Sequence, residues 1–232
     1  TEIYTLSLHD ALPICNFLLD QLLGAEVVWT TRTEREQTLQ MVFEQAWADG
    51  ARPFLIPLGA STPVGALGYA LAFDEFLAQK MEMDAIVIAS SSGGTQAGLV
   101  LGAKRAQWSG RVLGISIDHT QAELSARVAE LATQAAERLG ESFSIVAQDV
   151  LVEDGFLGAG YGVLDEPEKE AIHLFAKHEG LFLDPVYTGR AAAGLIGLIR
   201  AGAFRPRERV LFWHTGGTPA LFADEYAAQL QG

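Results

Sequence analysis

Residues 85–95 read AIVIASSSGGT, and this stretch decides the fold because it joins a buried strand to a polar turn. The five apolar residues Ala85–Ala89 predict a strand that is covered on both faces, as in a parallel sheet. The six small residues Ser90–Thr95 predict a tight turn that leads into a helix. The stretch therefore indicates the strand–turn–helix unit of an α/β fold.

Helical and strand patterns alternate along the rest of the chain. The predicted strands are Glu26–Thr30, Phe54–Pro57, Ala85–Ala89, Arg111–Ile117 and Val210–Trp213. The predicted helices are Asn16–Leu23, Glu34–Asp49, Val64–Lys80, Gln96–Ala106, Gln121–Leu139, Glu166–His178, Ala191–Ala201 and a last one from Pro219. Short strands that alternate with helices predict an open parallel sheet with helices on both faces, which is a three-layer α/β fold.

Composition excludes several classes of function. The 232 residues carry 16 basic and 29 acidic side chains, a formal net charge of −13, which argues against a nucleic-acid partner. The longest apolar run, Ala191–Ile199, is far shorter than the roughly 20 residues of a membrane span, so no membrane association is expected. Cys15 is the single cysteine and cannot form an internal disulfide, which favours a cytoplasmic location.

The first 14 residues, TEIYTLSLHDALPI, resemble a translated sequencing-adaptor read-through, and we expect them to be non-native. The small polar residues of Gly59–Thr62 mark the expected domain boundary. We therefore expect residues 15–60 to be the end of a smaller α/β domain and residues 61–232 to be the larger domain.

The Ser90–Thr95 turn carries the strongest chemical signal. Hydroxyls and two glycines at a helix start predict a phosphate site, because backbone N–H groups converge there on a partial positive charge. The chain has no GxxxxGK motif, and Ser92 stands where a dinucleotide fingerprint needs glycine. Asp118 nonetheless occupies the place of a ribose-binding acid. A sugar-phosphate isomerase or binding module that uses Ser90–Thr95 stays open as an alternative.

Three further segments are expected at the same edge of the sheet. A second glycine and hydroxyl turn, HTGGTP at residues 214–219, follows the last predicted strand. The segment DPVYTGR at 184–190 opens a helix, and Tyr161 lies in the glycine-rich stretch 158–162. Because ligands of open parallel sheets bind at the carboxyl ends of strands, we expect these segments to share one ligand.

Four ordered motifs, SSSGGTQAGL at 90–99, GYG at 160–162, DPVYTGR at 184–190 and HTGGTPALF at 214–222, resemble a known family. They are similar to the fold type II pyridoxal-phosphate enzymes, and within these to the branch of D-cysteine desulfhydrases and aminocyclopropane-carboxylate deaminases. The resemblance implies pyridoxal 5′-phosphate as cofactor and a homodimer. It implies that the cofactor phosphate is bound by Ser92, Gly93, Gly94 and Thr95, and that Tyr187 and Tyr161 line the reacting face as catalytic residues.

Two positions separate activities within this branch. The deaminases carry Glu and Leu where this chain has Thr188 and Thr215, whereas the desulfhydrases carry hydroxyl residues at both positions. The resemblance thus implies that Thr188 and Thr215 bind the cofactor and that the intact protein eliminates sulfide from D-cysteine, giving pyruvate, ammonia and hydrogen sulfide. Aminocyclopropane-carboxylate deamination is the alternative within the family, and the motifs leave other D-amino acids open as substrates.

The lysine that forms a Schiff base with the cofactor belongs, in this family, to an Asn-Lys motif upstream of residue 16, and the motif is missing here. The four lysines present, Lys80, Lys104, Lys169 and Lys177, fit helix surfaces. We therefore expect an N-terminally truncated chain without turnover of its own. His173 and His178 are not at the spacing of helical metal ligands, so no metal site is expected.

Overall fold

The computed structural model describes residues 4–8, 15–31 and 33–231, and its centre is a four-stranded parallel sheet. The strand order is β5 (Leu151–Glu153), β4 (Arg111–Ser116), β3 (Ala85–Ser90) and β6 (Val210–Trp213). In the register, Ser90 lies opposite Ser116 and Ile88 lies opposite Trp213. The carboxyl ends of β3, β4 and β6 therefore meet at one edge.

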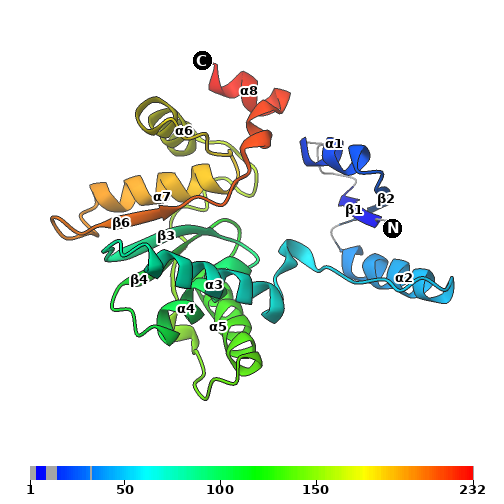
Figure 1. Cartoon of the computed structure of the whole chain (residues 1–232). Helices are drawn as coiled ribbons and strands as arrows, with labels where there is room; N and C mark the ends of the chain where they lie inside the picture. Colours follow the sequence, from blue (N-terminus) through cyan, green and yellow to red (C-terminus); the bar gives the residue numbers. More distant parts are fainter. Residues whose placement is uncertain (1–3, 9–14, 32, 232) are drawn as a thin grey trace.

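Helices cover both faces of this sheet (Figure 1). One face is covered by α3 (Pro63–Ala78), α4 (Gly94–Arg105) and α5 (Gln121–Arg138). The other carries α6 (Glu166–Glu179) and α7 (Thr188–Arg200). Short turns η1 (Leu58–Ala60), η2 (Ala147–Asp149) and η3 (Thr218–Phe222) and the helix α8 (Asp224–Leu230) complete this part. The predicted three-layer α/β fold is confirmed.

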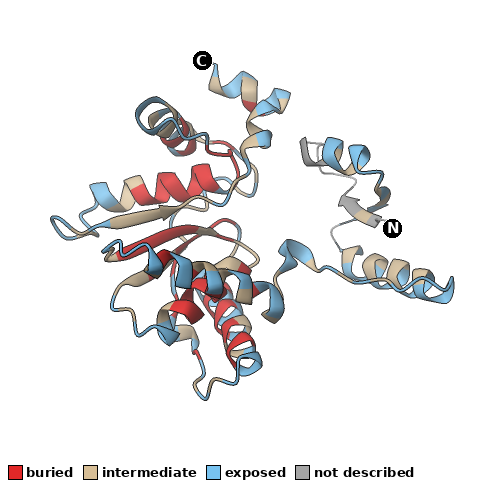
Figure 2. Cartoon of the chain, in the orientation of Figure 1, coloured by how far each residue is buried: buried red, intermediate tan, exposed pale blue. Residues whose placement is uncertain are grey.

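Strand β3 is buried on both faces because its side chains alternate between two apolar layers. Ile86 and Ile88 pack into the core formed with α3, α4 and α5, whereas Val87 packs with Ile115 and Leu195 on the α7 side. The buried residues accordingly concentrate in β3, α4, α5 and α7 (Figure 2).

Glycines let α4 approach α3 closely. A Cβ at Gly102 would lie 2.6 Å from Cβ of Phe73, and one at Gly98 would lie 2.5 Å from Cβ of Tyr69 and overlap the carbonyl oxygen of Ala66. Real side chains do not come this near, so only glycine allows the two helices to pack at this separation. The contact sets the separation between α3 and α4.

The N-terminal elements form a separate small layer. Strands β1 (Tyr4–Leu8) and β2 (Glu26–Thr30) pair in parallel, and α1 (Cys15–Leu22) and α2 (Arg35–Ala48) accompany them. No residue of α2 is buried, and α1 contacts η3 of the larger part. Of the suspected adaptor segment 1–14, residues 1–3 and 9–14 lie outside the described residues. Its non-native origin and the domain boundaries remain predictions.

The predicted strand Phe54–Pro57 is wrong. Phe54 is 87% exposed and Ile56 64% exposed, and no strand of the described chain runs beside this segment. Prolines at 53 and 57 remove N–H donors, so its alternating pattern has no partner to pair with. The three-residue edge strand β5 escaped prediction because it is too short to show a period.

Three helix starts differ from the predictions by more than one residue. The last helix, α8, begins at Asp224 and not at Pro219, because the short 3₁₀ turn η3 occupies Thr218–Phe222. Helix α4 begins at Gly94 and α7 at Thr188, two and three residues earlier than the apolar pattern indicates. In both cases the first turn is polar or glycine, so hydrophobic periodicity does not reveal it. Across the described residues, no helix is both long and apolar enough to cross a bilayer.

Candidate functional site

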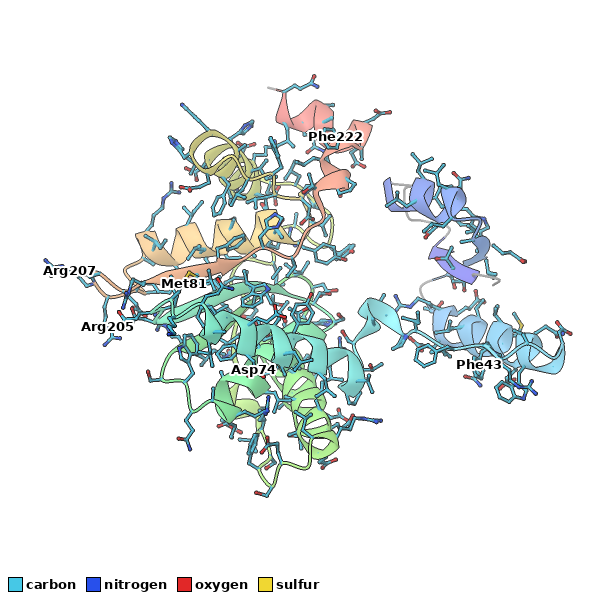
Figure 3. All side chains as sticks on the ribbon, in the orientation of Figure 1. Phe43, Asp74, Met81, Arg205, Arg207 and Phe222 are labelled. Carbon is cyan, nitrogen blue, oxygen red and sulfur yellow. The ribbon has the colours of Figure 1, made fainter. Side chains whose placement is uncertain are left out.

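The loops singled out in the sequence gather at the carboxyl edge of the parallel sheet. Ser90–Thr95 follows β3 and residues 214–218 follow β6, which pairs with β3. In Figure 1 this edge faces the side on which β1, α1, β2 and α2 lie. Arg205 and Arg207 project from the opposite edge, ahead of β6 (Figure 3). The site is thus formed by polar loops without this basic pair.

The Ser90–Thr95 turn forms a cradle at the amino end of α4. Gly93 caps the helix with φ of +88°, a conformation that favours glycine. A Cβ at Gly94 would lie 2.6 Å from Oγ of Ser61, so this position has no room for a side chain. The Ser61 hydroxyl donates to Oγ of Ser92 at 2.7 Å and accepts from the Gly94 N–H at 3.1 Å. Ser61 therefore braces the cradle from outside it.

The cradle offers groups that could bind an anion. Within the described chain, no acceptor pairs with the N–H groups of Thr95 and Gln96 in the first turn of α4. The Ser90 hydroxyl is buried and also lacks a hydrogen-bond partner among the described residues. Because an unsatisfied buried hydroxyl is costly, it favours a further polar group at this edge. Free amides at a helix start suit a phosphate.

Tyr161 and Tyr187 meet at the same edge of the sheet, where Tyr187 lies near Asp118, which follows β4. Their hydroxyls share a hydrogen bond, and their rings are edge to face with centroids 6.0 Å apart. Tyr187 is 38% exposed, and partial burial of its hydroxyl raises the pKa of that group above its ordinary value of 10.0; the bond from Tyr161 and the nearby carboxylates of Asp184 and Asp118 add to the shift. Tyr187 therefore stays protonated throughout the neutral range.

Asp184 builds the segment that presents Tyr187. Its Oδ2 accepts the N–H groups of Val186 and Tyr187, both at 2.8 Å. Its Oδ1 accepts the N–H and the hydroxyl of Thr188, both at 2.7 Å. The Thr188 hydroxyl in turn accepts the N–H of Asp184 at 2.8 Å. Thr188 is thus buried as part of a helix-capping network, and a contact from it to a cofactor remains a prediction.

The 214–218 turn packs against that network. A Cβ at Gly217 would lie 2.7 Å from the Asp184 carboxylate, so the two segments are in direct contact. The Thr218 hydroxyl donates to the carbonyl of Phe182 at 3.1 Å. Thr215, by contrast, is exposed and makes no side-chain hydrogen bond among the described residues. The cofactor contact predicted for Thr215 stays a prediction.

The structure brings the predicted residues together in two groups. Ser92, Gly93, Gly94 and Thr95 form the cradle, and Tyr161 and Tyr187 form the pair. Sequence reasoning missed Ser61, which it assigned to a domain boundary. The cluster of small polar residues GAST at 59–62 was a usable signal, because small residues let two segments approach closely. In the structure a Cβ on Gly59 would lie 2.8 Å from Cβ of Ser92.

The lysines lie elsewhere. Lys104 pairs with Asp149 and Lys169 pairs with Glu166, while Lys80 and Lys177 are exposed. Among the described contacts none of these four joins the cradle or the tyrosine pair. Within the ranges that the structure describes, His, Cys, Asp and Glu side chains also form no group of three suited to a metal ion.

Comparisons with known proteins place this geometry in context. Residues 5–216 match the family described as "Pyridoxal-phosphate dependent enzyme". The D-cysteine desulfhydrases of Salmonella paratyphi C (strain RKS4594) and Salmonella choleraesuis (strain SC-B67) are each 38% identical over 194 residues. These matches cover 82% of this chain, which spans 58% of the length of either relative.

Solved structures agree with the sequence matches. A crystal structure described as an ACC deaminase homologue is 31% identical, with a TM-score of 0.89 and coverage of 99% of this chain and 70% of that one. Serine racemase from Dictyostelium discoideum is 19% identical, with a TM-score of 0.56 and coverage of 94% and 68%. At that identity the second likeness concerns the fold alone.

Proposed function

We infer the function from the premise that the chain belongs to the family of pyridoxal-phosphate-dependent enzymes. We propose that the whole protein eliminates sulfide from D-cysteine. The observation that carries the proposal is that an anion cradle and a hydroxyl pair both lie at the carboxyl edge of one sheet. The similarity to D-cysteine desulfhydrases supports the choice of substrate.

The residues present fit pyridoxal phosphate. A dianionic phosphate needs several N–H donors and room for its oxygens, and the amino end of α4 supplies unpaired amides and side-chain-free glycines. Ser92, Gly93, Gly94 and Thr95 would hold the phosphate. The buried, unpartnered hydroxyl of Ser90 provides a further polar group at the same edge.

The proposed reaction converts D-cysteine and water to pyruvate, ammonia and hydrogen sulfide. The bond between Cβ and sulfur breaks, the Cα proton is lost, and water replaces the amino group. The bound cofactor supplies an electron sink that stabilises negative charge at Cα. No external oxidant or reductant is needed, since the overall change is an elimination followed by hydrolysis.

Tyr187 and Tyr161 would act on the reacting groups as hydrogen-bond donors. Because Tyr187 is held protonated, its hydroxyl can donate to the substrate or to the departing sulfur, but it cannot serve as a phenolate base near neutral pH. Tyr161 is half exposed, so its hydroxyl can contact solvent or substrate while it is hydrogen-bonded to Tyr187.

The choice between elimination and ring opening rests on Thr188 and Thr215. The Glu expected at the first position in deaminases would bring a carboxylate into the buried cap of α7, already occupied by Asp184. A neutral Thr188 avoids that like-charge pair. It also agrees with the hydroxyl residues that the resemblance to desulfhydrases implies at positions 188 and 215. Aminocyclopropane-carboxylate deamination remains the second candidate because a solved ACC deaminase homologue resembles the chain over 99% of its length.

The lysine that anchors the cofactor is part of the proposal. Since the four lysines of this chain lie away from the cradle, we propose that a segment outside these 232 residues supplies it. A cytoplasmic homodimer also belongs to the proposal, on the strength of the family resemblance.

Sulfide release from D-cysteine, with L-cysteine and aminocyclopropane carboxylate as competing substrates, tests this function. The protein extended by its upstream coding segment should release sulfide from D-cysteine, and Tyr187→Phe should lower kcat by about 100-fold. Tyr69→Phe, a tyrosine on α3 away from the pair, is the matched control and should keep full activity. Deamination of aminocyclopropane carboxylate without sulfide release would establish the alternative.

The 232-residue chain alone provides a second arm. It should show saturable binding of pyridoxal phosphate, seen as a change in cofactor absorbance, yet release no sulfide. Turnover by this chain would show that the assignment of its lysines to the surface is wrong.

A further inference from the structure

The loop of residues 158–163 carries Tyr161 and contains three glycines with positive φ. Gly158, Gly160 and Gly162 have φ values of +59°, +135° and +76°. Glycine loses more conformational freedom on ordering than any other residue, so such a segment stays in one conformation only when outside contacts hold it. The position of Tyr161 therefore depends on the residues that bind the loop through hydrogen bonds.

Arg190, on α7, holds the loop by a hydrogen bond to its backbone. Its side chain is fully buried, and its Nη2 donates to the carbonyl of Val163 at 3.0 Å. Nη1 donates to the carbonyl of Ile117 at 3.1 Å, and Nε donates to Oε1 of Glu168 at 2.8 Å. The planar guanidinium thus joins the loop, the end of β4 and α6 in a fixed geometry.

Tyr226, on α8, holds the same loop by a second hydrogen bond to its backbone. Its ring is buried, and its hydroxyl donates to the carbonyl of Gly162 at 2.7 Å. The two carbonyls that follow Tyr161, those of Gly162 and Val163, are therefore held from two different helices. Arg190 also lies one helical turn after Tyr187, so the group that holds the loop is fixed relative to the partner of Tyr161.

We propose that Arg190 and Tyr226 are positioning residues, which clamp the 158–163 loop so that the Tyr161 hydroxyl meets that of Tyr187. The consequence for catalysis rests on the proposed function, in which the two tyrosines act on the substrate. The clamp itself is a property of the fold and can be measured without any reaction.

Hydrogen exchange on the 232-residue chain tests the clamp. Tyr226→Phe removes a single hydroxyl, and the peptide that contains residues 158–163 should then exchange about fivefold faster, while β3 keeps its protection. Tyr69→Phe, the matched control, should leave the loop unchanged. Unaltered exchange of the loop in Tyr226→Phe, or an equal rise in every peptide, would overturn the clamp.

Arg190→Lys keeps the charge but loses the fork that binds three acceptors, and it should also speed exchange of the loop. If that variant does not fold, Tyr226→Phe decides alone. In the extended protein, Tyr226→Phe should lower kcat for sulfide release by about fivefold at unchanged KM, and the double variant with Tyr161→Phe should be no slower than Tyr161→Phe alone. If the two substitutions instead lower kcat by the product of their separate effects, Tyr226 does not act through Tyr161. Failure of the proposed function would instead appear as no sulfide from the unaltered protein, with the exchange result still standing.

Discussion

The tight contact between α3 and α4 gives a quantitative prediction for Gly98→Ala. The new Cβ would lie 2.5 Å from Cβ of Tyr69 and would overlap the carbonyl oxygen of Ala66, both on α3. Ordinary contacts begin near 3.4 Å, so α3 must move by about 1 Å. Overpacking against backbone lowers the free energy of unfolding by about 3 kcal/mol. Alanine has a higher helix propensity than glycine, which offsets about 1 kcal/mol of this loss. We expect a net loss of about 2 kcal/mol.

Urea unfolding followed by circular dichroism measures this loss. With a slope of about 2 kcal/mol per M, the midpoint of Gly98→Ala should fall by about 1 M. Gly68→Ala is the matched control, because it also lies in this helix pair but its Cβ would meet nothing within 4 Å. The control should be stabilised by up to about 1 kcal/mol. A Gly98→Ala midpoint at or above that of the unaltered chain would refute the packing argument.

Three other changes probe the capping groups and the tyrosine pair. The Thr62 hydroxyl accepts the Gly65 N–H at 3.0 Å at the start of α3, so Thr62→Ala should cost about 1 kcal/mol in urea unfolding; no change would show that this cap is dispensable. Asp184→Asn replaces one carboxylate oxygen, which accepts the N–H groups of Val186 and Tyr187, by an NH₂ group that can only donate. The variant should lower the free energy of unfolding in urea by about 1–3 kcal/mol. An unchanged urea midpoint would contradict the capping role of Asp184. Tyr187 is held neutral in the native state while its unfolded form ionises near 10.0, so stability should fall as pH rises above that value, and Tyr187→Phe should lessen the fall; equal slopes for the two proteins would rule out the raised pKa.

Much of the fold could be predicted because the signals are local. The continuous apolar run at Ala85–Ala89 and the helical periods around it define the central layers, and the strands Glu26–Thr30 and Val210–Trp213 have the predicted bounds. The Ser90–Thr95 turn identifies the cradle because its composition differs sharply from the strand before it. In each case a few adjacent residues carry the information.

The rest depends on partners that are distant in the sequence. Phe54–Pro57 shows the alternation of a strand, yet a strand forms only where a neighbour supplies hydrogen bonds. Ser61 becomes part of the site only because Gly59 and Gly94 let two segments approach, a contact across 31 residues of sequence between Ser61 and Ser92. The capping role of Thr188 likewise appears only when Asp184 is in place.

A crystal structure of the chain with pyridoxal phosphate tests the central claim most directly. The phosphate oxygens should lie within hydrogen-bond distance of the unpaired backbone N–H groups of Thr95 and Gln96, with the aromatic ring on the side of Tyr187. Phosphate density at another part of the molecule, with the amino end of α4 free, would contradict the assignment of this edge as the cofactor site.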